Sequence, residues 1–273
     1  MTVRRCKVFL VGEGSSDIGS LERIPQYRTS GRHGPGFLQP LIERIVGDDV
    51  ALEFDGQKYS TILVKDLSDP DLIQGRRARA ALAIAGITAG AKALVYLVDT
   101  DKEQGEAASD QEARRLHDAL RASIEEGFER ARRDDPPLGD VRTVTGVPLR
   151  MLEAWALGDP AAITAAGGDA SKVPPRPETL WGAKRNPSSN YPKHALARAL
   201  GASPSDGTDA DTFATLAAHA DPDVIARSCP VSFGPFLADV RAALAGCAAA
   251  NESDDATAPT QPPKRSPRGR KRG

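Results

Sequence analysis

The sequence predicts an α/β fold, in which a mostly parallel four-stranded sheet is flanked by helices and followed by a C-terminal helical appendage. The central observation is the run Val-Tyr-Leu-Val-Asp-Thr-Asp at residues 95–101. It is short, apolar, partly β-branched and preceded by a helix-like stretch, which is typical of a buried parallel strand. The second observation is a change after residue 158, where Ala-rich helical segments with Pro and Gly breaks replace the strand-like runs.

The other expected elements follow from hydrophobic patterning along the chain. Three further strands are predicted at residues 6–11, 59–64 and 141–145. The spacing of apolar and charged residues predicts helices at residues 37–46, 71–89 and 109–133. A segment rich in Gly and Pro, residues 19–36, interrupts this pattern and is expected to be an insertion or a loop.

The chain is expected to divide into three parts. Residues 1–158 form the α/β domain, residues 159–250 the helical appendage, and residues 251–273 a disordered basic tail. The tail has six Lys and Arg against three acids, a net charge of +3 that leaves −4 for residues 1–250 of a total of −1. Such a tail is either an electrostatic tether for nucleic acid or an acidic partner, or a solubilising end without a partner.

Composition favours a soluble cytoplasmic protein. No run of 18 apolar residues and no signal peptide is present, so no membrane association is expected. The cysteines are odd in number and widely spaced, which indicates no metal or disulfide framework and fits a reducing compartment. They are Cys6, Cys229 and Cys247. The four histidines show no ligand spacing either, so a zinc site is not expected.

Two aspartates end the central strand. Because side chains alternate along an extended chain, Asp99 and Asp101 should point the same way at the carboxyl end of a parallel strand, where open α/β sheets keep their sites. Two close carboxylates repel each other, and a cation such as Mg²⁺ or Mn²⁺ removes that cost. The alternative is a loop with two solvated aspartates that caps the next helix.

Two further acids stand in suggestive places. Glu13 lies between two glycines at the end of the first strand, so a ligand can approach it closely; the alternative is a Gly-rich turn with an exposed Glu. The spacing is neither G-x-G-x-x-G nor a P-loop. Glu153 sits among apolar neighbours in a short helix that begins near Pro148, and it is either solvated or directed inward as a ligand.

Together, these motifs resemble a family. Gly-Glu-Gly after the first strand and Asp-x-Asp after a later strand resemble the motif pair of the Toprim domain, found in topoisomerases, bacterial primases and the overcoming-lysogenization-defect nucleases. The segment Pro-x-x-Met-x-Glu-Ala-Trp-x-Leu-x-Asp at residues 148–159 is similar to a Toprim-like family often encoded beside an ABC-type or AAA ATPase in phage-defence loci. Later segments also match, so the resemblance covers roughly residues 6–244.

The resemblance implies a set of site residues. Glu13 matches the Toprim glutamate, and Asp99 and Asp101 match its Asp-x-Asp pair. The glutamate of the Glu-x-Trp motif, a fourth potential ligand, is Glu153. Two more positions imply second ligands: Asp17, an acidic position frequent in nuclease-type members, and Glu103, where many Toprim motifs carry a third Asp. A two-metal site would account for so many acids.

The predicted function is a Mg²⁺-dependent nuclease that hydrolyses phosphodiester bonds and serves as effector beside an ATPase in anti-phage defence. No tyrosine stands in an obvious partner position and no zinc motif is present, so neither topoisomerase nor primase chemistry is expected. One alternative is a phosphatase of the haloacid-dehalogenase type with Asp99 as nucleophile. The other is a non-catalytic subunit whose acids hold a metal for the fold.

The appendage supplies the expected substrate contacts. Its Pro-rich segment 173–192 and the residue after it carry several basic side chains, of which Lys184 and Lys193 are the candidates for phosphate contacts. Trp181 and Tyr191 lie in the same region. They could stack on bases, but we expect both to pack against the body of the protein instead.

Overall fold

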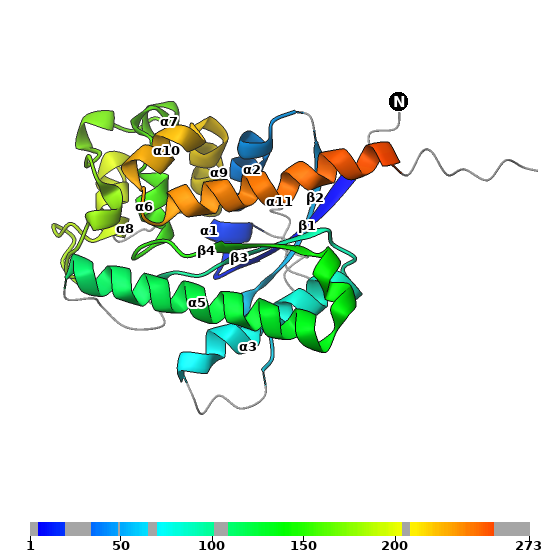
Figure 1. Cartoon of the computed structure of the whole chain (residues 1–273). Coiled ribbons are helices and arrows are strands. Elements are labelled where there is room, and N and C mark those ends of the chain that lie inside the picture. Colours follow the sequence, from blue (N-terminus) through cyan, green and yellow to red (C-terminus); the bar gives the residue numbers. More distant parts are fainter. Residues whose placement is uncertain are drawn as a thin grey trace, which may run out of the picture.

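The computed structural model describes residues 5–19, 34–48, 50–64, 70–100, 109–203 and 208–253. Within this part of the chain, four strands form one sheet in the order β2-β1-β3-β4, and all neighbouring strands are parallel. Helices cover both faces of the sheet, and a further group gathers beyond one of its ends (Figure 1). The predicted α/β fold is confirmed.

Three strands lie where the sequence predicted them: β1 (Arg5–Gly12), β3 (Ala93–Leu97) and β4 (Arg142–Gly146). All residues of β3 are buried, because parallel strands with helices on both faces need apolar side chains on both. The register pairs Val11 of β1 with Tyr96 of β3, which in turn pairs with β4. The three strands therefore end at a common edge of the sheet, and the loops that follow them meet there.

The strand predicted at residues 59–64 is wrong. The second strand is β2 (Ala51–Lys58), which pairs with β1 along its whole length, and Tyr59–Thr61 form a 3-10 turn. Because β2 lies at the edge of the sheet, only Gly56 among its residues is buried, and the strand needs no apolar run. The more apolar residues after it serve a turn that buries Ile62 in the core.

One face of the sheet is covered by α3 (Pro70–Ala83), which continues as a π-helical turn at Ile84–Thr88, and by α5 (Asp110–Asp134). The backbones of α3 and α5 touch where they cross. A Cβ added at Gly127 would lie 2.1 Å from the carbonyl oxygen of Gly75. Glycine at this crossing lets both helices lie close against the sheet.

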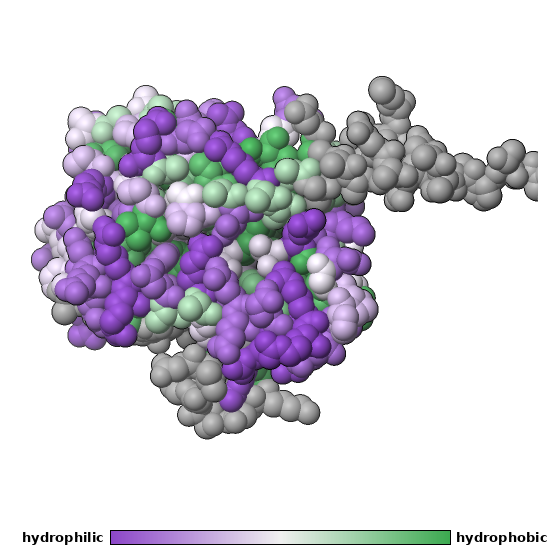
Figure 2. Space-filling view, viewed as in Figure 1, coloured by the Kyte–Doolittle hydropathy of each residue, from purple (hydrophilic) through white to green (hydrophobic). Residues whose placement is uncertain are grey.

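The outer side of α5 is a solvated surface. Figure 2 shows a mainly hydrophilic surface over α5 and a paler band along α11 (Phe233–Ser253). On α5, Arg115 is ion-paired with Glu112, and Arg130 with Glu126. Pairs of this kind within an exposed helix face contribute little to stability.

The opposite face is covered by α1 (Ser15–Ile18), α2 (Leu38–Val46) and α11. The helix predicted at residues 37–46 is confirmed as α2. In Figure 1, α11 runs along the sheet beside α2. Apolar side chains from α2, α11 and the sheet form one hydrophobic cluster, which includes Val8, Leu41 and Phe236.

Short helices form the region at the end of the sheet, at the left in Figure 1. They are α6 (Leu152–Ala156), α7 (Pro160–Ala165), α8 (Pro192–Ala199), α9 (Ala210–His219) and α10 (Pro222–Ser228). Their apolar residues belong to the same cluster that fills the space between α11 and the sheet. The appendage therefore shares a hydrophobic core with the α/β part rather than packing on it from outside.

Several expectations fall outside the described residues. Most of the loop predicted at 19–36 does, and so does the basic tail from residue 254 onward. Residues 251–253, assigned above to the tail, belong to α11. Among the helices that the structure describes, none has the length and apolar character needed to cross a membrane.

The prediction that the cysteines form no disulfide is wrong for one of them. Cys6, at the start of β1, is disulfide-bonded, and its partner lies outside the described side chains. Cys229 is a buried free thiol, and burial raises its pKa well above the usual range. Spacing in the sequence does not report which cysteines meet in space, so an odd count could not exclude a bridge.

Candidate functional site

The first loop of the site follows β1. Glu13 comes directly after Gly12, and Asp17 lies on α1, the short helix that begins after Gly14. The Asp17 carboxylate folds back on this turn, because its Oδ2 accepts hydrogen bonds from the backbone N of Glu13 (2.5 Å) and of Gly14 (3.2 Å). A Cβ at Gly12 would lie 2.8 Å from the Cβ of Asp17, so only glycine permits this close approach. The turn fixes Glu13 at the carboxyl end of β1.

The second loop follows β3 and contacts the loops on either side. The backbone N of Asp99 donates a hydrogen bond to Oε1 of Glu13 at 3.2 Å. The Oδ1 of Asp99 accepts one from the backbone N of Leu152 at 3.0 Å. The hydroxyl of Thr100 accepts another from the backbone N of Arg150 at 2.7 Å. These bonds place the Asp99 carboxylate between the first loop and the start of α6.

Glu153 lies in the first turn of α6, immediately after the residue that donates to Asp99. Asp17, Asp99 and Glu153 are each only 7% exposed. The fully solvated interpretations of Asp99 and Glu153 are therefore excluded. Three separate segments of the chain bring these acids and Glu13 to one edge of the sheet.

Crowding of these acids has an electrostatic consequence at Asp17. Burial, followed by the neighbouring Glu13 carboxylate and with a smaller contribution from the Glu153 carboxylate, raises the pKa of Asp17 to about 7. The two backbone N–H donors act in the opposite direction but do not compensate. A buried carboxyl surrounded by like charges is the arrangement that a bound cation would relieve.

A basic residue, Lys193, lies at this cluster. Its Nζ lies 3.7 Å from Oε1 of Glu153, and its side chain, on α8, is 46% exposed. Lys184, the other predicted substrate contact, is exposed, and the described part of the chain shows no contact between it and an acid of the cluster. Lys193 is thus positioned where the buried acids meet solvent.

The remaining predicted ligands cannot be placed. Asp101 and Glu103 lie outside the described residues. Among the side chains that the structure does describe, no group of three or more His, Cys, Asp or Glu is arranged closely enough to hold a metal ion. The described acids contact one another's loops, as the hydrogen bonds of Asp99 show. In the sequence, Asp101 directly follows Thr100, and Glu103 stands two positions further on.

Arg150 is a residue of this region that the sequence argument did not single out. It is almost fully buried and adopts a left-handed backbone conformation, with φ of 73°. Its guanidinium lies 3.6 Å from Oδ1 of Asp110 at the start of α5. Backbone strain of this kind clusters at functional sites. The signal available in the sequence was an arginine between Leu149 and Met151, where an apolar residue would be expected.

The tryptophan of the Glu-x-Trp motif has a structural role. Trp155 is fully buried and packs against Phe233 and Phe236 of α11, with ring centroids 5.1 and 4.9 Å apart. Its Nε1 donates a hydrogen bond to Oγ of Ser232 at 2.7 Å. That hydroxyl donates in turn to the buried Glu178 carboxylate at 3.0 Å. Trp155 therefore anchors α6, and with it Glu153, to the appendage.

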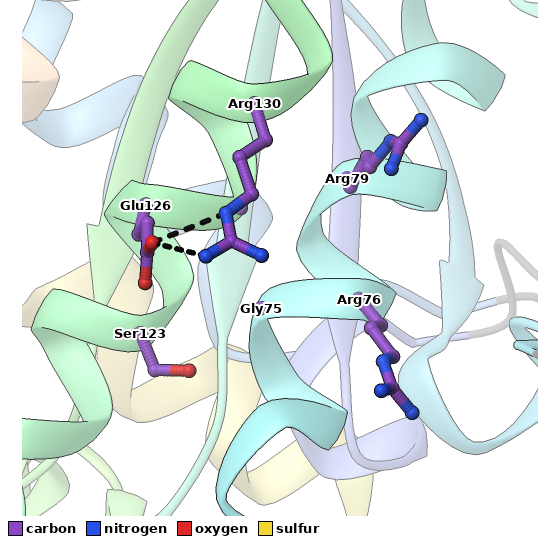
Figure 3. A pocket seen from close by; sticks show the side chains of 7 residues that line it. Gly75, Arg76, Arg79, Ser123, Glu126 and Arg130 are labelled. Atoms are coloured by element: carbon purple, nitrogen blue, oxygen red, sulfur yellow. Dashed lines mark hydrogen bonds and ion pairs between the residues drawn. The ribbon is translucent and has the colours of Figure 1, made fainter. Parts of the chain in front are cut away.

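A cavity elsewhere on the surface lacks the features of this site. It has a volume of about 120 Å³ and lies between α3 and α5, where Arg76, Arg79 and Arg130 line it (Figure 3). Arg130 turns toward Glu126, and Arg79 is ion-paired with Asp134 at 2.7 Å. Its positive charge is therefore largely compensated, and none of the acids described above lines it.

The chain was compared with family models, with curated proteins and with solved structures, and no match was found in any of the three.

Proposed function

We propose that the protein is a Mg²⁺- or Mn²⁺-dependent nuclease that hydrolyses phosphodiester bonds. The observation that carries this proposal is the convergence of Glu13, Asp17, Asp99 and Glu153 from three separated segments at the carboxyl edge of a parallel sheet. Their burial and mutual repulsion, expressed in the raised pKa of Asp17, are a cost that a protein without a cation partner has no reason to retain.

The donor set fits a hard divalent cation. All candidate ligands are carboxylate oxygens, which suit Mg²⁺ and Mn²⁺, and no imidazole or thiolate is among them. Glu13, Asp99 and Glu153 would hold the ion, with Asp101 as the second member of the Asp-x-Asp pair and Asp17 and Glu103 as further ligands. When bound, the cation supplies Lewis-acid stabilisation of charge on the phosphate.

The residues of the chain itself have separate tasks. Asp17 holds the turn that carries Glu13, and the Leu152 N–H orients the Asp99 carboxylate. Lys193 offers a cationic group at the solvent side of the cluster, where an anionic phosphate would approach. Activity beside an ATPase in anti-phage defence is part of the proposal only through the Toprim-like resemblance.

The test is cleavage of nucleic acid by the purified full-length chain. Labelled single-stranded DNA, duplex DNA and RNA are incubated with Mg²⁺, with Mn²⁺ or with EDTA. We expect cleavage only with a divalent cation. Asp99→Asn and Glu13→Gln should each reduce the rate at least about 100-fold, because changes at residues that merely support metal ligands already cost 10- to 100-fold.

The matched control is Glu129→Gln, the same change at an exposed glutamate of α5. It should leave the rate unaltered, and thermal unfolding should show that all three variants are folded. Cleavage in EDTA, or full activity of Asp99→Asn, would refute the proposal. Hydrolysis of a small phosphoester without cleavage of nucleic acid would favour the phosphatase alternative instead.

A further inference from the structure

The segment of the appendage that surrounds Lys193 in the sequence is unusually cationic. Between residues 179 and 205 the sequence has four Lys and Arg and no Asp or Glu. They are Lys184, Arg185, Lys193 and Arg198. The exposed side chains of Lys184 and Arg185 form no ion pair within the described part of the chain. Their charge is therefore available to an external anion.

The same segment exposes a tryptophan. Both aromatic residues of this region were expected to pack against the body of the protein, and Tyr191 does so, with 6% of its surface exposed. The packing expected of Trp181 is wrong, because 52% of its surface is exposed. About half of this large aromatic side chain is in contact with solvent, so its ring is accessible to a ligand.

The loop that carries Trp181 is preformed. Gly182 packs against the chain near Tyr191, since a Cβ there would lie 2.7 Å from the backbone N of Tyr191. The hydroxyl of Ser189 donates to the carbonyl oxygen of Ala183 at 2.8 Å. The guanidinium of Arg198 donates to the carbonyl oxygens of Pro187 and Ser189, each at 2.9 Å. Residues 181–190 thus form a closed loop fastened to α8.

This loop lies next to the acid cluster. Tyr191, against which Gly182 packs, is followed by Pro192 and Lys193 in the first turn of α8, and Lys193 reaches Glu153. Both α8 and α6 lie at the same end of the molecule in Figure 1. The loop that carries Trp181, Lys184 and Arg185 is therefore joined directly to the residue that contacts the buried acid Glu153.

We propose that Trp181 stacks on a base of an unpaired nucleotide, while Lys184 and Arg185 hold the adjoining phosphates, so that a single strand is directed over Lys193 to the acid cluster. This inference rests on the proposed nuclease function for the fate of the strand, but not for its binding. Stacking platforms beside cationic grooves are how proteins bind single strands without reading sequence.

Charge complementarity and the surroundings of Trp181 favour nucleic acid over a protein partner. Most exposed residues of the same loop are basic or hydrogen-bonding, namely Lys184, Arg185, Asn186, Ser188 and Asn190, and the other two are the small or rigid Ala183 and Pro187. A protein interface would need a wider apolar core around its aromatic anchor. A base needs only the exposed ring face and a nearby cation for its phosphate.

The experiment is a fluorescence titration of the full-length chain in EDTA, where no cleavage occurs. The probes are a single-stranded dT oligonucleotide, the corresponding RNA and a blunt duplex. The second tryptophan, Trp155, is fully buried, so a change on binding reports Trp181. We expect quenching by the single strands, and little by the duplex. Trp181→Ala, followed by anisotropy of a labelled strand, should weaken binding roughly 5- to 150-fold, and Trp181→Phe should retain most of it.

The control is Ile87→Ala, which removes another strongly exposed apolar side chain and should not alter binding. Absence of quenching by both single strands, equal affinity of Trp181→Ala and wild type, or equal effects on strand and duplex would each overturn the inference.

Cleavage assays in Mg²⁺ separate the two proposals. Trp181-dependent binding without any cleavage would refute the nuclease and leave the stacking surface standing. If Trp181→Ala binds like the wild type and cleavage depends on a metal, the stacking surface is refuted and the nuclease proposal stands.

Discussion

Two groups of buried carboxylates in this molecule have opposite environments. Glu178 is surrounded by donors: its Oε1 accepts from the backbone N of Val231 at 2.9 Å, and its Oε2 accepts from the backbone N and the hydroxyl of Ser232 at 3.1 and 3.0 Å. Asp17 has two backbone donors but is also faced by the carboxylates of Glu13 and Glu153, and its pKa is raised to about 7.

The difference separates an acid that stabilises the fold from acids that strain it. Hydrogen bonds to the charged form offset the cost of burying Glu178, so that group holds the appendage to α6. At Asp17 the donors are outweighed by burial and by like charge. Both carboxylates are buried, so burial does not distinguish the two cases. The groups that surround each carboxylate distinguish them. Substitutions that remove charge without changing shape should therefore act in opposite directions at the two places.

The largest effect is expected from Glu178→Gln. The amide nitrogen of Gln must face either the N–H of Val231 or that of Ser232, so a buried donor meets a donor and a charge-assisted bond is lost. We expect the free energy of unfolding to fall by about 4 kcal/mol. Urea denaturation at neutral pH measures this value. The exposed Glu129→Gln change should be nearly neutral, and a loss at Glu178 below about 1 kcal/mol would remove the distinction between the two environments.

Asp17→Asn should have the opposite sign. Asn retains an oxygen that can accept from the N–H groups of Glu13 and Gly14, and it removes the repelled charge. Because the folded-state pKa of Asp17 is raised from 3.8 to about 7, its contribution to stability is greatest below pH 4 and is lost as the pH rises to about 7. The shift bounds the gain on removing the charge at roughly 4 kcal/mol, and we expect about 2 kcal/mol at pH 8.

The measurement for Asp17 is urea denaturation at pH 5 and pH 8 without divalent cations. From pH 5 to pH 8, the free energy of unfolding should fall more steeply for the wild type than for Asp17→Asn. Metal-dependent cleavage by the variant should decline at the same time, if the strained carboxyl is retained for a cation. Parallel pH profiles of the two proteins would show that Asp17 is not strained.

The strands that the sequence predicted correctly are those with several buried residues. β1 and β3, the two inner strands, are covered on both faces, and their apolar runs were recognised; β4 lies at the other edge, but three of its five residues are buried and it was predicted as well. β2 was missed because an edge strand with one buried residue, Gly56, carries no such run. Position at the sheet edge is a tertiary property, and the local pattern of Ala51–Lys58 does not contain it.

In the candidate site, too, some residues could be predicted from the sequence and others could not. Acids at strand ends, Glu13 and Asp99, could be anticipated because a parallel sheet brings strand ends together. The role of Glu178 could not, because its donors come from residues more than 50 positions away in the chain. The exposure of Trp181 was missed because an aromatic residue in a Pro-rich segment is as compatible with packing as with a surface. Contacts distant in sequence decide each of these cases.

The smallest effect is expected from Lys193→Ala, at the boundary between the crowded acids and solvent. A half-exposed ion pair contributes little to stability, so the unfolding free energy should change hardly at all. If Lys193 contacts a phosphate, single-strand binding in EDTA should weaken uniformly across sequences, about 2- to 10-fold, and the slope of binding against salt should fall by about 1. Lys172→Ala is the matched control, since Lys172 forms a similar exposed pair with Asp169 at 3.6 Å. Equal salt slopes for the two variants would assign Lys193 to the Glu153 ion pair alone. A lower slope for Lys193→Ala only would place the path of the strand over the point where the acid cluster opens to solvent.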